Sequence, residues 1–510
     1  MSSVRPAIGL DFGTSTTLVA SPSGVVPIGE VSAWMPSLVG YDDEGQVVVG
    51  ELAQDVPDEQ MVRSIKRLIT DGRSVVRLQT PTGLRDVPAD DLIVKMLQEA
   101  ATRSAASGQD MTGPHPVRLG CPAMWDGKQR RRLVELARRA GLPVTLANIV
   151  DEPVAAGIAW LAGRKPDSSA PMRVVVFDMG GGTLDIAVLD VRGSQHRDVS
   201  VLAAIGVAEA GDTLDDAITE DMEYVLAAAG VDIDSLERPR RARARLAYAA
   251  RAAKIGLSTE TEVDVKLSRR EFGISSVVYR RSYLDQAFAP QMDRAEQYVA
   301  AALRAAHLAE MVSGSVTDIL RMETDELTEK VDVVVLSGGM SQIPYVAQRM
   351  AELFPAWTRV EMACEPSDNA VALGLAKAGH YGRINMYRPA FDILLEWDSK
   401  RETRKIYEAY TPLIEGRQIA RGGSDLRFVR TGQELSLPDG GSGKLRLVSH
   451  SGEKVRASLA GTSLEGFRVA LSEQKFEFSI YPNGRLRLTD ADATYDGHIE
   501  DWHALQDTAQ

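Results

Sequence analysis

The chain has 510 residues, of which 44% are hydrophobic and 25% charged, a composition typical of a soluble globular protein of about three units. Its net charge of −13 argues against sequence-independent nucleic-acid binding, which needs a basic face to neutralise phosphates. We expect no secretory signal before the first predicted strand and no membrane span, because no apolar run is long enough for either. Cys121 and Cys364 cannot form a disulfide framework, so we expect reduced thiols in a cytoplasmic protein.

The first informative segment, residues 7–20, reads AIGLDFGTSTTLVA. It is an apolar strand, an aspartate, a glycine-containing turn with hydroxyl residues and a second apolar strand. Residues 174–189, VVVFDMGGGTLDIAVL, repeat this order. Self-similarity between segments this far apart in the sequence predicts two related halves of the chain rather than a short-repeat solenoid. A third strand, in residues 331–344, also ends in a glycine turn and leads into a helix.

Helical stretches lie between these strands. Residues 128–141 and 369–379 have apolar residues at helical spacing and end in a glycine, and residues 283–308 are a long amphipathic stretch. Strands that alternate with helices predict α/β units with buried sheets.

Beyond about residue 385, short alternating strands and turn signals replace the helical pattern. In residues 475–490, KFEFSIYPNGRLRLTD, apolar and polar residues alternate on both sides of an Asn483-Gly484 turn, which predicts a β-hairpin. We therefore expect a separate β-rich domain over residues 386–490. Residues 491–510 are polar, and we expect them to form a tail or a single short helix.

The two aspartate-led turns have the chemistry that a triphosphate requires. Glycine lets backbone N–H groups approach phosphate oxygens, hydroxyls add donors, and a divalent metal needs carboxylates. Asp11 and Asp178 stand at strand ends, where they can point at a shared Mg²⁺ through waters, and Asp185 can support the second turn. The other candidate phosphate ligands are Gly13, Thr14, Ser15, Gly180, Gly181, Gly182 and Thr183.

Each turn alone could be only a tight β-turn, but two in register, with a third glycine turn at Gly338-Gly339, favour a nucleotide site. No GxGxxG opens a helix after a strand and no GxxxxGK[ST] occurs, so a dinucleotide fold and a P-loop are not supported. The nearest P-loop-like stretch, GGSGKL at 440–445, is better interpreted as a hairpin loop of the β domain.

At this point the sequence resembles a known superfamily. The three glycine-turn segments resemble the two phosphate motifs and the adenosine motif of the actin, sugar-kinase and Hsp70 proteins. Four further segments are similar specifically to the Hsp70 (DnaK-like) chaperone family, and the resemblance covers about residues 5–380. These segments are SIKRLIT at 64–70, GCPAMWDGKQRRRL at 120–133, IVDEPVAAGIAW at 149–160 and EPSDNAVALGLAKAG at 365–379.

The resemblance implies an α/β fold: a two-lobed, actin-like (duplicated RNase H-like) ATPase domain over residues 1–385, followed by a smaller antiparallel β domain. Lobe I would comprise about residues 1–170 and 363–385, and lobe II about residues 171–362.

The resemblance also implies roles for individual residues. Lys66 would lie beside the γ-phosphate and help to position the attacking water, Glu152 would orient water and metal-bound ligands, and Asp178 would receive the water's proton. Asp11 would hold Mg²⁺ through its waters. Pro122 and Arg130 match the family's relay between the nucleotide and the interdomain surface. The further nucleotide contacts that it implies are Gly211, Asp212, Lys254, Ser258, Gly338, Gly339, Met340, Gln342 and Asp368.

The chain departs from the family's pattern in two places. Gln342 stands where a base-stacking arginine is usual, and Arg251 where a glutamate is usual, so base selectivity stays open. Asn148 and Asp151 stand where the family usually presents an arginine and an asparagine to J-domain partners. Losing a cationic anchor weakens a charge-steered encounter, so a standard J-protein partner is in doubt.

The implied activity is slow, Mg²⁺-dependent ATP hydrolysis, with ATP and ADP as ligands and K⁺ as a further candidate ion. Nucleotide state would be coupled to binding of an unfolded or extended polypeptide by the β domain. Segments 391–398, 411–422 and 476–491 resemble parts of the family's substrate domain, while the last 20 or so residues are too few for a helical lid of several helices.

Implied partners are the polypeptide client and a nucleotide-exchange factor, and we expect a monomer with no nucleic-acid or membrane partner. The alternatives are a nucleotide-gated regulatory module, an actin-fold small-molecule kinase and an actin-like filament. The appended β domain makes a filament less favoured.

Overall fold

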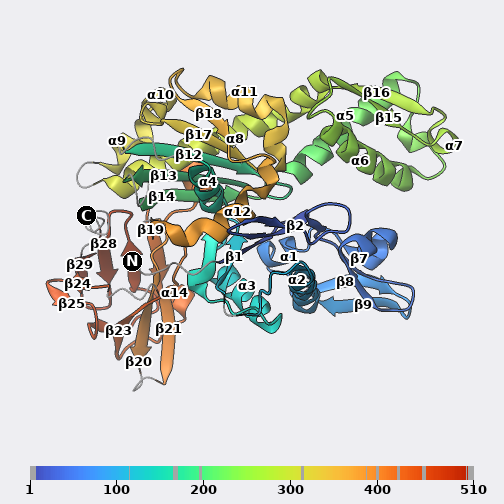
Figure 1. The fold of residues 1–510 in the computed structure, drawn as a ribbon. Helices are drawn as coiled ribbons and strands as arrows, with labels where there is room; N and C mark the ends of the chain where they lie inside the picture. Colours follow the sequence, from blue (N-terminus) through green and yellow to red (C-terminus); the bar gives the residue numbers. More distant parts are fainter. Residues whose placement is uncertain are drawn as a thin grey trace.

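The structure, a computed structural model, has two α/β lobes and a β-rich C-terminal domain. Figure 1 shows lobe II above lobe I, with the C-terminal domain beside lobe I. Among the residues that the structure describes, which the next sentence gives, no helix is long and apolar enough to cross a bilayer. The described residues are 7–113, 115–164, 171–193, 198–311, 315–385, 387–397, 401–421, 426–450, 455–500 and 502.

Lobe I is built on a sheet with the strand order β11-β10-β1-β2-β3. β1 pairs antiparallel with β2 and parallel with β10, and β10 pairs parallel with β11. These strands are β1 (Ile8–Phe12), β2 (Thr16–Ser21), β3 (Gly24–Val26), β10 (Val117–Cys121) and β11 (Ile149–Asp151).

Lobe II repeats this topology, with the order β18-β17-β12-β13-β14 and the same parallel and antiparallel relations. The two halves predicted from the repeated hairpin are therefore present, and the two-lobed actin-like fold is confirmed. These strands are β12 (Met172–Met179), β13 (Leu184–Arg192), β14 (Asp198–Val207), β17 (Val333–Ser337) and β18 (Arg359–Met362).

A sixth strand, β19 (Gly382–Asn385), pairs parallel with β14 at the far edge of the lobe II sheet. The expected assignment of residues 363–385 to lobe I is therefore wrong for its last part. The chain leaves helix α12 (Ala370–Lys377) and crosses back to lobe II before it enters the C-terminal domain.

Helices α4 (Glu152–Ala162) and α12 lie between the two sheets (Figure 1). Their close approach depends on glycines, because a Cβ at Gly374 of α12 would clash with the backbone of Ala155 in α4. A Cβ at Gly9 of β1 would likewise clash with α12. The catalytic candidates on β1 and at the start of α4 are thus fixed by close backbone packing.

The remaining elements surround the two sheets. In lobe I they are β4 (Met35–Pro36), β5 (Val39–Tyr41), β6 (Val47–Val49), β7 (Met61–Val62), α1 (Arg67–Thr70), β8 (Val75–Thr80), β9 (Gly83–Pro88), α2 (Ala89–Ala106) and α3 (Gly127–Arg139). In lobe II they are α5 (Gly211–Ala228), α6 (Pro239–Gly256), β15 (Glu262–Lys266), α7 (Arg269–Phe272), β16 (Ser276–Arg280), α8 (Arg281–Glu310), α9 (Val316–Arg321), α10 (Thr324–Thr328) and α11 (Pro344–Leu353).

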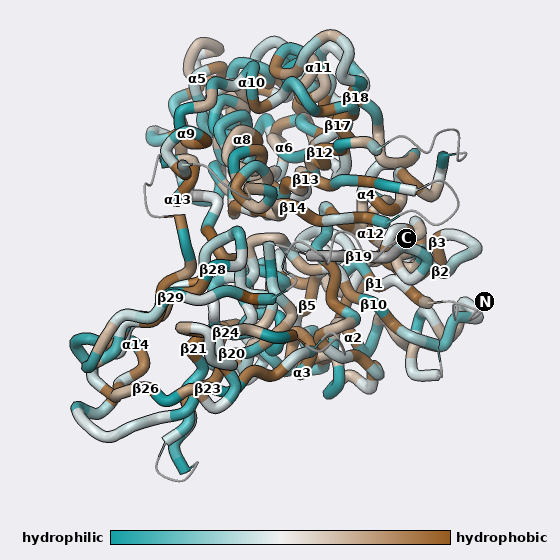
Figure 2. Tube along the Cα trace, turned by 90° about the vertical axis from the view of Figure 1, so that its left-hand side faces the viewer, coloured by the Kyte–Doolittle hydropathy of each residue, from teal (hydrophilic) through white to brown (hydrophobic). Residues whose placement is uncertain are grey.

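The C-terminal domain has two antiparallel sheets, with the orders β21-β20-β23-β26 and β22-β27-β28-β29-β24-β25. Its short helix α13 (Gly416–Ala420) packs against α8 of lobe II (Figure 2). The other elements are β20 (Phe391–Trp397), β21 (Glu402–Tyr407), β22 (Phe428–Thr431), α14 (Gly432–Leu435), β23 (Ser442–Ser449), β24 (Ala457–Leu459), β25 (Thr462–Ser463), β26 (Arg468–Ala470), β27 (Glu477–Ile480), β28 (Arg485–Thr489) and β29 (Thr494–Ile499).

The hairpin predicted in residues 475–490 is formed by β27 and β28, with Phe478 opposite Leu488 and Ile480 opposite Leu486. The expectation of a tail or helix after residue 490 is wrong for β29, which pairs with both β28 and β24. Most of β29 is exposed or half-buried, so it lacks the apolar alternation that would have marked a strand.

Candidate functional site

The two aspartate-led turns are closed by the same hydrogen bond. The Gly13 N–H donates to the Thr16 carbonyl at 3.0 Å, and the Gly180 N–H donates to the Thr183 carbonyl at 3.0 Å. Each bond joins the end of one buried strand to the start of the next. The repeated sequence pattern therefore produces the same turn in both lobes.

The two turns face each other across the lobes. A Cβ at Gly181 would clash with the Ser15 hydroxyl, and a Cβ at Gly182 would lie 2.8 Å from both Oγ1 and Cγ2 of Thr14. Only glycine leaves the second turn this close to the first. The predicted phosphate ligands of both lobes are thus brought to one place.

The predicted lysine and glutamate are paired beside the turns. Lys66, just before α1, donates from Nζ to Oε1 of Glu152, the first residue of α4. Only 2% of Lys66 and 7% of Glu152 is exposed. Nζ also lies 5.8 Å from the centroid of the Trp125 ring. An ammonium group buried this deeply requires such partners.

Three buried aspartates accompany this pair. Burial, followed by the charge of Glu152, raises the pKa of Asp11 and of Asp185 to about 7. Burial and the charges of Glu152 and Asp185 raise the pKa of Asp178 well above its usual value. Burial lowers the pKa of Lys66, but the charges of Glu152 and Asp11 outweigh it, so the net pKa is raised. We name Asp11, Asp178, Asp185, Glu152 and Lys66 the carboxylate cluster.

The carboxylate cluster has four carboxyl groups and one ammonium group, which suits a hard divalent cation. In the part of the chain that the structure describes, no three Asp, Glu, His or Cys side chains converge as direct metal ligands. A cation at Asp11 and Asp178 would therefore need water or phosphate oxygens to complete its coordination.

Asp185 is fixed from lobe I, because its Oδ1 accepts the Ala123 N–H at 2.6 Å. The segment that carries Ala123 follows β10 and includes Pro122, whose carbonyl accepts the Trp125 N–H at 3.1 Å. Arg130, the other predicted relay residue, donates from Nε to the Trp125 carbonyl at 3.1 Å. The segment thus connects the second phosphate turn with α3.

The first turn of α5 is bonded to the second phosphate turn. The N–H groups of Gly211 and Asp212 donate to the carbonyls of Gly180 and Gly181, at 3.1 and 2.7 Å respectively. Lys254 of α6 donates from Nζ to the Gly211 carbonyl at 3.1 Å. Gly211 and Asp212 therefore contact the phosphate turn directly, and Lys254 is linked to it through Gly211.

Ser258 lies just after α6, and Arg251 lies on this helix. The Ser258 hydroxyl donates to the Lys254 carbonyl at 3.4 Å, so it is engaged within its own helix end. Arg251, which replaces the usual glutamate, is exposed on α6. Arg67 reaches from lobe I to Asp212 in lobe II, with Nη1 3.3 Å from Oδ2.

The third glycine turn follows β17 and touches the carboxylate cluster. Gly338 has φ +81°, and a Cβ there would lie 2.8 Å from Oδ1 of Asp178 and clash with the Met179 carbonyl. A Cβ at Gly339 would meet nothing within 4 Å, and Met340 is buried. Glycine is required at the first position, while the second borders open space.

The Asp368 loop lies beside this turn, because the Ser367 hydroxyl donates to the Gly338 carbonyl at 3.1 Å. Oδ1 of Asp368 is buried and accepts no hydrogen bond within the described residues. Burial raises the pKa of this carboxyl group. Gln342 is exposed at the end of the turn. An orphan acceptor beside an open turn is consistent with a ligand on this side.

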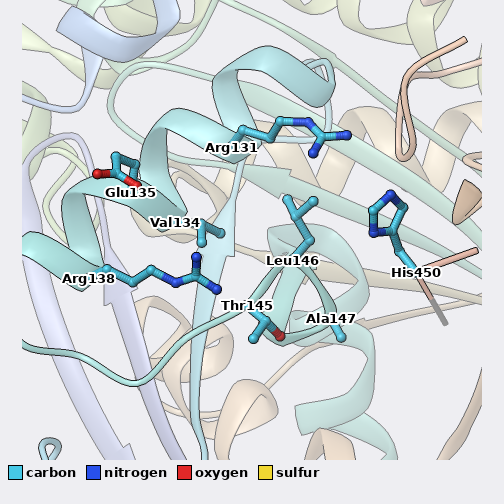
Figure 3. A pocket seen from close by; sticks show the side chains of 8 residues that line it. All are labelled: Arg131, Val134, Glu135, Arg138, Thr145, Leu146, Ala147 and His450. Carbon is cyan, nitrogen blue, oxygen red and sulfur yellow. The ribbon is translucent and has the colours of Figure 1, made fainter. Parts of the chain in front are cut away.

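A groove of about 370 Å³ lies outside this site, between α3 and the C-terminal domain. Figure 3 shows Arg131, Arg138 and His450 around it, with Leu146 between them. Arg131 donates to both oxygens of Asp392, at 2.9 and 3.1 Å, so this arginine ties α3 to β20.

Sequence reasoning missed several residues around the site, above all Arg67, Trp125 and Arg388. Each acts through a partner that is distant in sequence. Arg67 and Trp125 lie within the family-like segments 64–70 and 120–133, but nothing local marks their contacts. Asp151 was noticed only as a departure from the family, although it is 3% exposed and pairs with two arginines.

Comparisons with known proteins agree with this geometry. The profile of the family described as "Hsp70 protein" matches residues 7–383. "Chaperone protein DnaK" of Thermotoga maritima is 30% identical over 388 residues, which cover 72% of this chain and 58% of the relative. "Chaperone protein HscA homolog" of Bordetella petrii is 30% identical over 396 residues, which cover 72% and 57%. The match thus spans less than two thirds of the length of either relative. Because the family profile spans most of the chain and both phosphate turns, the chain belongs to the Hsp70 family.

Proposed function

We propose that this chain binds ATP with Mg²⁺ between the two phosphate turns and hydrolyses it slowly to ADP and phosphate. The observation that carries the proposal is that the paired glycine turns lie beside the carboxylate cluster. Backbone N–H groups and hydroxyls of the turns would bind the phosphates, and the third glycine turn would border the adenosine.

Asp11 and Asp178 would hold the cation through waters and phosphate oxygens, and the cation would neutralise charge on the phosphates. Lys66 would place its ammonium group beside the γ-phosphate, with Glu152 holding that group in position. Asp178 would take a proton from the attacking water, because it is buried near the end of the strand that precedes the second phosphate turn. Hydrolysis then depends on positioning and charge neutralisation.

The Lys66→Ala variant tests this mechanism. We expect binding of ATP to persist and single-turnover hydrolysis to fall by about 10²-fold, because one preorganised charge at the transferring phosphoryl group is lost. Lys95→Ala, an exposed lysine on α2, is the matched control and should hydrolyse ATP at the wild-type rate. Unchanged turnover in Lys66→Ala would falsify the mechanism.

We further infer a chaperone role, in which nucleotide state biases binding of an extended polypeptide by the C-terminal domain. Its support is the family membership and the ion pairs that Arg131 makes with Asp392 and Glu408 across the domain boundary. Coupling between two sites is reciprocal, so a client must also change nucleotide affinity. A nucleotide-exchange factor would be a further partner of the same cycle.

The test of the chaperone role is steady-state ATP turnover with and without an unfolded polypeptide that lacks charge clusters. We expect the polypeptide to change turnover in the full chain, and Arg131→Gln to weaken that response. If the polypeptide changes turnover equally in Arg131→Gln and in the wild type, the interdomain ion pairs do not transmit its effect.

A further inference from the structure

Helices α5 and α6 are adjacent in space and opposite in charge. α5 contains six acidic and no basic residues, whereas α6 contains six basic and no acidic residues. The helices run antiparallel, since Lys254 near the end of α6 lies 2.6 Å from Asp215 near the start of α5. At their other ends, Arg243 of α6 pairs with Glu223 of α5 at 3.0 Å. Figure 1 shows both helices at the end of lobe II that lies farthest from the C-terminal domain.

The ion pairs between the two helices use only part of their charge. Four further charged residues are exposed and, among the residues that the structure describes, form no ion pair or hydrogen bond through their side chains: Asp216, Glu220, Arg240 and Arg251. The first two lie on α5 and the last two on α6. Each helix thus presents unpaired charge of its own sign to solvent.

Large apolar side chains lie among these unpaired charges. Tyr224 of α5 is 77% exposed, and Tyr248 and Ile255 of α6 are 74% and 65% exposed. Helical spacing places Tyr224 in line with Glu220, and Tyr248 and Ile255 in line with Arg251. The opposite sides of both helices are buried in the lobe II core, so the two exposed stripes form one outward surface, the α5–α6 face. Exposed tyrosines of this kind are typical of protein–protein interfaces.

We propose that the α5–α6 face binds a second copy of this chain, in a symmetric dimer in which α5 of each copy lies on α6 of the other. A two-fold axis parallel to the helices brings the acidic stripe of one copy onto the basic stripe of the other, and symmetry repeats the contact. An axis across the helices would place α5 on α5 and α6 on α6, where like charges repel. The face is therefore complementary to itself in the first arrangement and not in the second.

Asp216 and Arg251 are the residues that this arrangement brings together most directly. Their neighbours Asp215 and Lys254 form the ion pair that sets the level of one helix against the other. Asp216 and Arg251 therefore lie near the same level, and a two-fold axis parallel to the helices preserves that level. Asp216 of one copy then faces Arg251 of the other, twice in each dimer. This dimer differs from the monomer expected from the sequence, and it does not depend on ATP hydrolysis.

Sedimentation velocity of the full chain without nucleotide, at concentrations up to about 100 μM, tests the proposal. We expect a monomer–dimer equilibrium in about 0.1 M salt and a shift to monomer in about 1 M salt, because the Debye length falls from about 10 Å to about 3 Å. Asp216→Arg and Arg251→Glu should each raise the dissociation constant about tenfold or more, since each dimer then contains two like-charge contacts. Lys95→Glu, at an exposed position on α2, is the matched control and should dimerise like the wild type.

An equimolar mixture of Asp216→Arg and Arg251→Glu is the decisive sample. In the mixed dimer the two changed positions face each other with opposite charges, and so do the two unchanged ones, so we expect the mixture to recover the dissociation constant of the wild type. A wild-type chain that stays monomeric in about 0.1 M salt overturns the proposal and leaves the α5–α6 face to a different protein. Dimers that both variants retain, or that the mixture fails to restore, overturn it as well, because another surface would then hold the copies together.

Discussion

Two buried clusters of opposite charge balance meet at the peptide bond between Asp151 and Glu152. The carboxylate cluster has four carboxyl groups around Lys66, and three of its aspartates have a raised pKa. A second cluster consists of Asp151, Arg130 and Arg388, and we name it the arginine cluster. It has two guanidinium groups around Asp151, with backbone carbonyls as further partners. The first has four carboxyl groups against one ammonium group, whereas the guanidinium groups of the second contact a carboxylate and backbone carbonyls. We therefore expect the carboxylate cluster to bind a ligand and the arginine cluster to hold parts of the chain together.

The largest expected effect comes from Asp178→Asn in the carboxylate cluster. Loss of the proton acceptor should reduce single-turnover hydrolysis by about 10²-fold or more. The same change removes one of four crowded carboxyl groups, so the ligand-free protein should become more stable. Hydrolysis and thermal unfolding measured on one preparation check both effects.

The matched control is Asp86→Asn, whose side chain is 72% exposed on β9. It should change neither turnover nor the unfolding temperature. A ligand-free Asp178→Asn protein that is less stable than wild type would contradict the view that the carboxylates repel one another.

Asp151→Asn in the arginine cluster should have the opposite effect on stability. It leaves two buried guanidinium groups without their carboxylate, and breaking a buried pair from one side costs about 3 kcal/mol or more. The double variant Asp151→Asn/Arg388→Gln removes one of the stranded charges and should be less destabilised than the sum of the two single changes. Urea unfolding of the four proteins gives this cycle. Additive effects would show that the two side chains are not coupled.

The pH dependence of stability is expected to follow the carboxylate cluster. The pKa of Asp11 and Asp185 is about 7 in the folded chain, against an ordinary value of 3.8. Between these values the folded state holds more protons than the unfolded state, so the free energy of unfolding should fall as the pH rises from about 4 to about 7. Mg²⁺ with ADP should offset the buried negative charge of the carboxylate cluster and stabilise the protein more at pH 8 than at pH 5.

Unfolding temperatures at pH 5, 6, 7 and 8, with and without Mg²⁺ and ADP, measure this contribution. Asp178→Asn serves as the internal comparison, since it should flatten the pH dependence of the ligand-free protein. An equal shift by the ligand at pH 5 and pH 8 would speak against a cation site among these carboxylates.

The two clusters also differ in how far the sequence could predict them. Each phosphate turn is encoded locally, by an apolar strand, an aspartate and a glycine turn, so Asp11, Asp178 and the shared topology of the lobes could be inferred. The roles assigned to these residues stay predictions. Lys66 and Glu152 required the family resemblance, because nothing in their local sequence shows that they meet.

The arginine cluster could not be predicted, because Arg388 has no motif and finds Asp151 only through the crossing of the chain from lobe I to lobe II. β29 was missed for a related reason, since its pairing with β24 and β28 depends on backbone bonds rather than on an apolar pattern. Local patterns thus reveal turns and hairpins, while contacts that join distant segments need the fold.

The smallest expected effect comes from Arg67→Gln, which breaks an ion pair that is exposed to water rather than buried. Arg67 and Asp212 form an ion pair across the lobes at 3.3 Å, but their side chains are 43% and 30% exposed. Exposed pairs contribute about 0–1 kcal/mol and weaken with salt, because water screens both charges. Arg67→Gln should therefore change the unfolding temperature little in low salt and less in high salt, whereas the effect of Asp151→Asn should persist at both. A salt-insensitive loss in Arg67→Gln as large as that in Asp151→Asn would mean that the cross-lobe pair, and not the buried arginine cluster, holds the lobes together.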